Sequence, residues 1–133
     1  MNTKQIWANL AVKDLERTTS FYTNLGFKSN NPRPSKELTS FMVGNNNFVI
    51  HFLKESKLKT ASNGELANLK KGNEVLFTLA ASSVDEVNQW ELEVKNAGGT
   101  IVSKPHEFGE GYYGFVFSDP DGHKFNVFYM DGF

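Results

Sequence analysis

The sequence contains no cysteine, which excludes disulfide bridges, zinc fingers and thiol catalysis. A chain without disulfides fits a reducing compartment, so we expect a cytoplasmic protein. Long apolar runs are also missing, because no stretch approaches the ~20 residues that a membrane-spanning helix needs. The first residues, Met1 to Gln5, lack the apolar run of a secretory signal. We therefore expect no membrane partner.

A large net charge is missing as well. Fourteen Lys and Arg residues against fifteen Asp and Glu residues leave a net charge of −1, which argues against a nucleic-acid partner bound by phosphate neutralisation. The 133 residues are enough for one domain with a buried core. Aromatic residues, in contrast, are abundant at 14%, with twelve Phe. Some of these side chains belong to the core, and others can line a pocket for an apolar or planar ligand.

The first half of the chain predicts a strand, a helix and then short strands. Residues 6–12 form an apolar strand candidate that contains Asn9, and Asp14 follows as a helix N-cap. The helix is predicted by apolar or small residues at spacings of three and four, and Gly26 ends it. These residues are Leu15, Thr18, Phe21, Tyr22 and Leu25. Further strands are predicted at residues 27–29, 38–43 and 48–53.

Residues 55–73 have a different composition, because Lys, Ser, Asn and Gly dominate. This pattern favours a solvated surface connector with one short helix around residues 65–70. A lid over a functional site is the alternative interpretation.

The second half repeats the pattern of the first. Residues 74–81 predict a strand, and Ser83 with Glu86 forms a capping box for a helix that stops at Gly98. A strand at 100–103 and a loop at 105–111 follow. The chain ends in a β-hairpin, with strands at 114–118 and 124–129 joined by the turn Asp119-Pro-Asp-Gly122.

Short stretches of the two halves correspond to each other. Asn9-Leu-Ala matches Thr78-Leu-Ala at an offset of 69 (78 minus 9), and His51 matches Asn126 at an offset of 75 (126 minus 51). We therefore predict an α+β fold of two βαβββ modules, residues 4–54 and 74–131, within one domain. Their mixed sheets are expected to curve around a central cavity.

The same layout resembles the vicinal oxygen chelate superfamily, which includes glyoxalase I, extradiol dioxygenases, fosfomycin resistance enzymes and bleomycin-binding proteins. Three stretches carry the resemblance: residues 9–27, the Ala97-Gly-Gly99 helix end, and Asp119-Pro-Asp-Gly-His123 with the strand after it. The group of predicted lactoylglutathione lyases is the most similar, since it shares the apolar-Asn-Leu opening and the Gly-His after the last turn.

The resemblance also implies where a metal would bind. Metal-dependent members take four ligands, typically His or Gln, Glu, His and Glu, from the first and last strand of each module. These positions correspond here to Trp7, His51, Leu76 and Asn126. Trp7 and Leu76 cannot ligate a metal and Asn126 is a weak donor, so only His51 is a good ligand. We expect no metal and no other cofactor.

The predicted site residues each have a structural alternative. His51 is a candidate ligand contact or general base, or else a half-buried histidine tied to one neighbour. Asn126, in an otherwise apolar strand, either lines the site or faces water. Trp7 is either a stacking wall or a plug, and Asn9 is a weaker polar candidate. Phe128 is expected to face the cavity, and Tyr112 or Tyr113 contributes a hydroxyl or is an exposed loop aromatic.

Two functions remain open at this point. The first is a metal-free binding protein for a planar or aromatic small molecule, as in the bleomycin-binding relatives. The second is a glyoxalase-like lyase or isomerase that uses His51 as a base or holds a divalent metal weakly. Under both hypotheses the resemblance implies a homodimer that covers the exposed strand edges.

Overall fold

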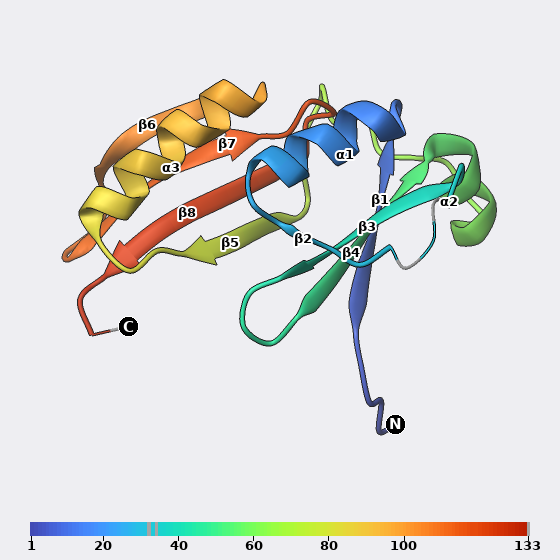
Figure 1. Ribbon diagram of the computed structural model, residues 1–133, viewed down its shortest axis with the longest axis horizontal. Helices are drawn as coiled ribbons and strands as arrows, with labels where there is room; N and C mark the ends of the chain where they lie inside the picture. Colours follow the sequence, from blue (N-terminus) through green and yellow to red (C-terminus); the bar gives the residue numbers. More distant parts are fainter. Residues whose placement is uncertain (32, 34, 133) are drawn as a thin grey trace. The chain divides into compact units, whose positions relative to one another are not determined.

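A computed structural model describes residues 1–31, 33 and 35–132. The chain forms two compact units, Met1–Ala67 and Asn68–Phe133, so the division falls inside the predicted connector. Each unit contains its own sheet and its own helix across that sheet (Figure 1).

The first unit is a four-stranded mixed sheet in the order β1-β4-β3-β2. The pair β1–β4, with β1 at the edge of the sheet, is parallel, and the other pairs are antiparallel. Helix α1 packs on β3 and β4, and α2 contacts β1 and β4. The bounds are β1 Trp7–Val12, α1 Leu15–Asn24, β2 Lys28–Ser29, β3 Leu38–Val43, β4 Phe48–Lys54 and α2 Glu55–Ser62.

The second unit repeats this topology, with strand order β5-β8-β7-β6 and a parallel pair β5–β8. Helix α3 packs on β6, β7 and β8. The bounds are β5 Leu76–Ala80, α3 Val84–Ala97, β6 Thr100–Glu107, β7 Tyr112–Ser118 and β8 Lys124–Met130. The predicted α+β fold of two βαβββ modules is therefore confirmed.

The registers of the two parallel pairs follow the offsets found in the sequence. Asn9 lies opposite His51 in the first sheet, and Thr78 lies opposite Asn126 in the second. The differences are 69 (78 minus 9) and 75 (126 minus 51), so each residue of one pair has its counterpart in the other. His51 and Asn126 thus occupy equivalent places in the two modules.

Both main helices begin where the sequence predicts. The Asp14 carboxylate accepts a hydrogen bond from the Arg17 backbone N–H at 3.0 Å. The Ser83 hydroxyl accepts one from the Glu86 N–H at 3.0 Å, and the Glu86 carboxylate accepts in return from the Ser82 N–H at 2.5 Å. The N–H groups of Arg17 and Glu86 belong to the first turns of the two helices, which leave them without a backbone partner.

The connector helix was predicted in the wrong place. Helix α2 covers Glu55–Ser62, directly after β4, and residues 65–70 are not helical. The side chain of Asn68 accepts a hydrogen bond from the Lys70 backbone N–H at 3.0 Å. Such a local bond stabilises a turn at the expense of a helix, which explains the difference.

Strand β6 is longer than predicted, because residues 105–107 extend it instead of forming a loop. Pro105 lies in a stretch where the pairing with β7 shifts register between Ser103 and His106. Strand β6 is at the edge of its sheet, where a proline without an N–H is tolerated.

The turn between β7 and β8 is held by hydrogen bonds within the turn and by two residues at the end of the connector. The Asp119 carboxylate accepts from the backbone N–H groups of Asp121 and His123 at 3.0 and 2.9 Å. Gly122 has a φ of +99°, which explains the glycine there. The Asn73 side chain donates to the Gly122 carbonyl at 2.8 Å, and a Cβ at Gly122 would lie 3.2 Å from the Cβ of Leu69.

Among the residues that the structure describes, no helix has the length and apolar character needed to cross a membrane.

Candidate functional site

Two sheet faces carry the predicted site residues, one in each module. In the first module, Tyr22 of α1 stacks on Phe52 of β4 with ring centroids 4.4 Å apart, so Phe52 marks the helix-covered side. Side chains alternate along a strand, which places His51 on the opposite side. This His51 face is formed by Trp7, Asn9 and Ala11 of β1, Val49, His51 and Leu53 of β4, and Leu38, Ser40 and Met42 of β3.

In the second module, the buried residues Phe125 and Val127 of β8 mark the helix-covered side. The opposite side is the Asn126 face. It is formed by Leu76, Thr78 and Ala80 of β5, Lys124, Asn126 and Phe128 of β8, and Tyr112, Gly114 and Val116 of β7.

His51 is held between a hydroxyl and an indole. Its Nδ1 lies 2.8 Å from the Ser40 hydroxyl oxygen on the neighbouring strand β3. The Trp7 indole meets the imidazole edge to face, with centroids 6.2 Å apart and planes at 67°. Partial burial lowers the pKa of His51 below its ordinary value of 6.5, so the ring is neutral at pH 7.

Ser40 was not predicted as a site residue, yet it is fixed by four hydrogen bonds. Its side-chain oxygen accepts from the Asn30 amide at 3.2 Å, besides the contact with His51. Its backbone N–H donates to the Asn31 side chain at 2.6 Å, and its carbonyl accepts from the Asn30 N–H at 2.8 Å. The available signal was a polar residue in the middle of a strand next to the one that carries His51.

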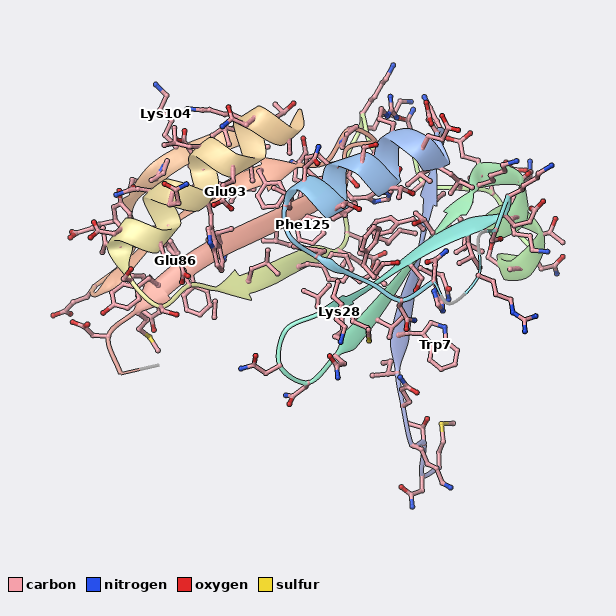
Figure 2. The ribbon with its side chains drawn as sticks, viewed as in Figure 1. Trp7, Lys28, Glu86, Glu93, Lys104 and Phe125 are labelled. Carbon is pink, nitrogen blue, oxygen red and sulfur yellow. The ribbon has the colours of Figure 1, made fainter. Side chains whose placement is uncertain are left out.

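Trp7 and Asn9, two of the candidate site residues, lie beside His51 on the first sheet. Asn9 is opposite His51 across the β1–β4 pair, and both side chains are on the same face. Trp7 remains 49% exposed although it is a large aromatic residue. Figure 2 shows its indole standing out from β1, away from helix α1. The structure thus brings Trp7, Asn9, His51 and the additional Ser40 together on one face.

The second module brings Asn126, Phe128 and Tyr112 together on the Asn126 face. Tyr112 also lies against the Phe108 ring, with centroids 6.0 Å apart. Tyr113 points to the other side of the sheet, where its hydroxyl donates to Asn88 of α3 at 2.8 Å. Within this module Tyr113 is therefore separated from Asn126 by the sheet. A role in ligand binding stays a prediction for the residues of this face.

The side chains do not fit a metal centre. The described residues contain no group of three or more His, Cys, Asp and Glu side chains that could hold a metal ion. Trp7 and Leu76 offer no donor atom for a metal, and both are about half exposed, at 49% and 53%. Asn126 has Thr78 and Val116 as its strand neighbours, and neither brings a carboxylate or an imidazole.

Comparison with known proteins fits this architecture. Residues 4–127 match the family profile described as the Glyoxalase/Bleomycin resistance protein/Dioxygenase superfamily. The chain belongs to this superfamily.

Several solved structures resemble this superfamily member. A hypothetical protein from S. aureus is 32% identical, with a TM-score of 0.85 and coverage of 97% of this chain and 95% of the other. A lactoylglutathione lyase from Agrobacterium tumefaciens is 19% identical, with a TM-score of 0.69 and coverage of 96% and 95%. A fosfomycin resistance protein from Listeria monocytogenes is 18% identical, with a TM-score of 0.71 and coverage of 97% and 92%. The last two similarities show the fold alone. No curated protein matches the chain.

Proposed function

We propose that this superfamily member binds a small planar or aromatic molecule on its His51 face, without a catalytic metal. The half-exposed Trp7 indole in contact with His51 is the observation that carries the proposal. A large aromatic side chain left exposed on a folded sheet offers a stacking surface for a flat ring. His51, with one ring nitrogen bonded to Ser40, has its other nitrogen available for a polar group of the ligand.

The absence of a catalytic metal is proposed from the chemistry of the side chains. Two of the four positions that the superfamily resemblance assigns to metal ligands hold Trp7 and Leu76. The third, Asn126, is a neutral amide, so His51 is the one strong donor of the four. A transition metal needs three or four donors of this strength, and the residues do not supply them.

A glyoxalase-like lyase that uses His51 as a base is the second candidate. The lowered pKa of His51 favours it, because a base must be neutral at working pH. This function requires a lone pair on Nε2, the ring nitrogen that is not bonded to Ser40. A hemithioacetal isomerisation assay tests it directly, and turnover that is lost in His51→Ala would establish this function instead.

Fluorescence titration tests the binding proposal. The chain has two tryptophans, so Trp90→Phe leaves Trp7 as the single reporter. We expect saturable quenching of Trp7 by at least one compound from a panel of quinones, naphthoates and polycyclic dyes at micromolar concentrations. His51→Ala should weaken that binding. No saturable response from any compound would overturn the proposal. A stoichiometric divalent metal in protein purified without chelators, lost in His51→Ala, would overturn its metal-free part.

We also propose a homodimer. In the part of the chain that the structure describes, β1 and β2 are the edge strands of the first sheet, and β5 and β6 are those of the second. Exposed edges of this kind are commonly covered by a partner chain. Light scattering after size-exclusion chromatography should give twice the chain mass of 15.0 kDa, and a monomer at high micromolar concentration would refute the dimer.

A further inference from the structure

The hydrogen bonds around Ser40 determine where its hydroxyl proton goes. A serine hydroxyl has one proton to donate and two lone pairs. The Asn30 amide nitrogen donates to the Ser40 oxygen at 3.2 Å, so the oxygen is the acceptor in that bond. His51 Nδ1, at 2.8 Å, is the other side-chain partner of this oxygen among the described residues. The proton is therefore directed at Nδ1.

This direction fixes the tautomer of the imidazole. A neutral histidine carries one N–H, and a ring nitrogen that accepts a hydrogen bond cannot carry it. If Nδ1 of His51 accepts from Ser40, the proton of the ring is on Nε2. The free nitrogen of His51 is then a donor and has no lone pair for proton abstraction.

Ser40 is well placed to impose this choice. It is only 2% exposed, and its backbone is bonded to both Asn30 and Asn31. These backbone bonds hold Ser40 next to the Asn30 side chain, whose amide nitrogen faces the Ser40 oxygen. In this arrangement the relay from Asn30 through Ser40 to His51 runs in one direction.

The charges of the first sheet point to the same ligand chemistry. Its four strands contain two lysines, Lys28 and Lys54, and no acidic residue. Of the two, Lys28 is on the His51 face, whereas Lys54 is on the side of Phe52. Lys28 lies opposite Met42, in the row of paired residues that also contains Val49 and Trp7. A ligand with a negatively charged acceptor group suits this sheet better than a cation.

We propose that Ser40 is a positioning residue that holds neutral His51 as its Nε2–H tautomer, so that His51 selects a hydrogen-bond acceptor, such as a carboxylate, on the planar ligand. The tautomer is a property of the unliganded protein. The ligand preference rests on the proposed function, because it requires that a planar molecule bind on the His51 face.

Nitrogen-15 NMR of histidine-labelled protein measures the tautomer directly. At a pH where His51 is neutral, we expect its Nε2 signal to be that of a protonated nitrogen and its Nδ1 signal that of an acceptor. His51→Gln assigns these signals among the three histidines of the chain. An Nδ1–H tautomer in the native protein would overturn the inference.

Reversing the relay gives the sharpest test. In Asn30→Asp, the new carboxylate has no N–H to donate and accepts the Ser40 proton instead. Ser40 must then accept from His51, so the ring should switch to the Nδ1–H tautomer. Thr39→Val is the matched control, because it removes a hydroxyl from the residue that precedes Ser40 in β3. Thr39 is 6% exposed and lies on the α1 side of the sheet. A tautomer unchanged in Asn30→Asp contradicts the role of Ser40.

Two probes with the same ring test the ligand preference. We expect 2-naphthoate to bind about tenfold more tightly than 2-naphthylmethylammonium, measured from the shift of the Trp7 indole N–H signal. Asn30→Asp should abolish this difference. Equal binding of the two probes to the native protein would overturn the preference. Failure of both probes to bind would overturn the preference. If the whole panel of quinones, naphthoates and dyes also fails to bind while the Nε2–H tautomer is observed, the proposed function is refuted and the role of Ser40 is supported.

Discussion

Gly114→Ala is expected to destabilise the second module strongly, because the site has no room for a methyl group. A Cβ at Gly114 would lie 2.1 Å from the Val127 carbonyl oxygen and 3.0 Å from the Phe128 Cα. Both atoms belong to the backbone of β8, the strand that carries Asn126. A third contact, 2.9 Å to Cε1 of the Phe108 ring, involves a side chain that can move.

The size of the loss in free energy of unfolding depends on which atoms must move to make room for the added methyl group. Adding a methylene to a packed core costs about 1–3 kcal/mol, and occasionally more. Here β8 is paired with β5 on one side and β7 on the other, so its backbone cannot shift without loosening hydrogen bonds. We expect the free energy of unfolding to fall by about 3 kcal/mol or more. For a domain of this size that corresponds to a decrease in Tm of roughly 10 °C.

Urea denaturation followed by circular dichroism measures this loss. Gly72→Ala is the matched control, because Gly72 is exposed, has no atom within 4 Å of an added Cβ and has no positive φ. We expect the control to change the free energy of unfolding by less than about 0.5 kcal/mol. The double variant Phe108→Ala/Gly114→Ala should stay destabilised. Restored stability in the double variant, or a loss below about 1 kcal/mol in Gly114→Ala, would refute the backbone clash.

Three further predictions concern other parts of the chain. Asp119→Ala should lower the free energy of unfolding by about 2–4 kcal/mol in urea denaturation, because two N–H groups lose a buried acceptor. Asp119→Asn keeps an acceptor oxygen, so its free energy of unfolding should fall by less. Ser83→Ala should cost about 1 kcal/mol in the same assay through loss of the α3 cap, whereas Ser82→Ala should be nearly neutral, because Ser82 contributes its backbone N–H. The pKa of His51 is lowered in the folded protein, so just below pH 6.5 the unfolded chain binds more protons than the folded one. The free energy of unfolding should therefore rise with pH across that window. This contribution to the pH dependence should vanish in His51→Gln and persist in His106→Gln.

Local patterns predicted the order of the elements because each one depends on nearby residues. The caps at Asp14 and Ser83 need only a side chain and an N–H group three residues further along the chain. The internal repeat gave the correspondence of His51 and Asn126, which the two strand registers reproduce. These features require no knowledge of how distant segments pack.

The residues that escaped prediction depend on pairing between strands. Alternation assigns Ser40 to a face, but only the register of β3 against β4 places it opposite His51. Tyr113 was considered as a loop residue, whereas β7 already begins at Tyr112, so alternation sends the two tyrosines to opposite sides. The connector helix was misplaced because an asparagine turn prevailed over the composition of residues 65–70.

The bond from Asn73 to the Gly122 carbonyl determines where this chain can be divided. Leu69 and Asn73 contact Gly122 in the turn between β7 and β8, so the end of the connector is part of the second compact unit. Proteolytic cleavage at residues 63–67 would leave both contacts intact, whereas cleavage at residues 70–72 would detach Leu69 from the turn. A second half produced separately should therefore begin at Asn68. One that begins at Glu74 would leave the Gly122 carbonyl without its donor and would loosen the hairpin that carries Asn126.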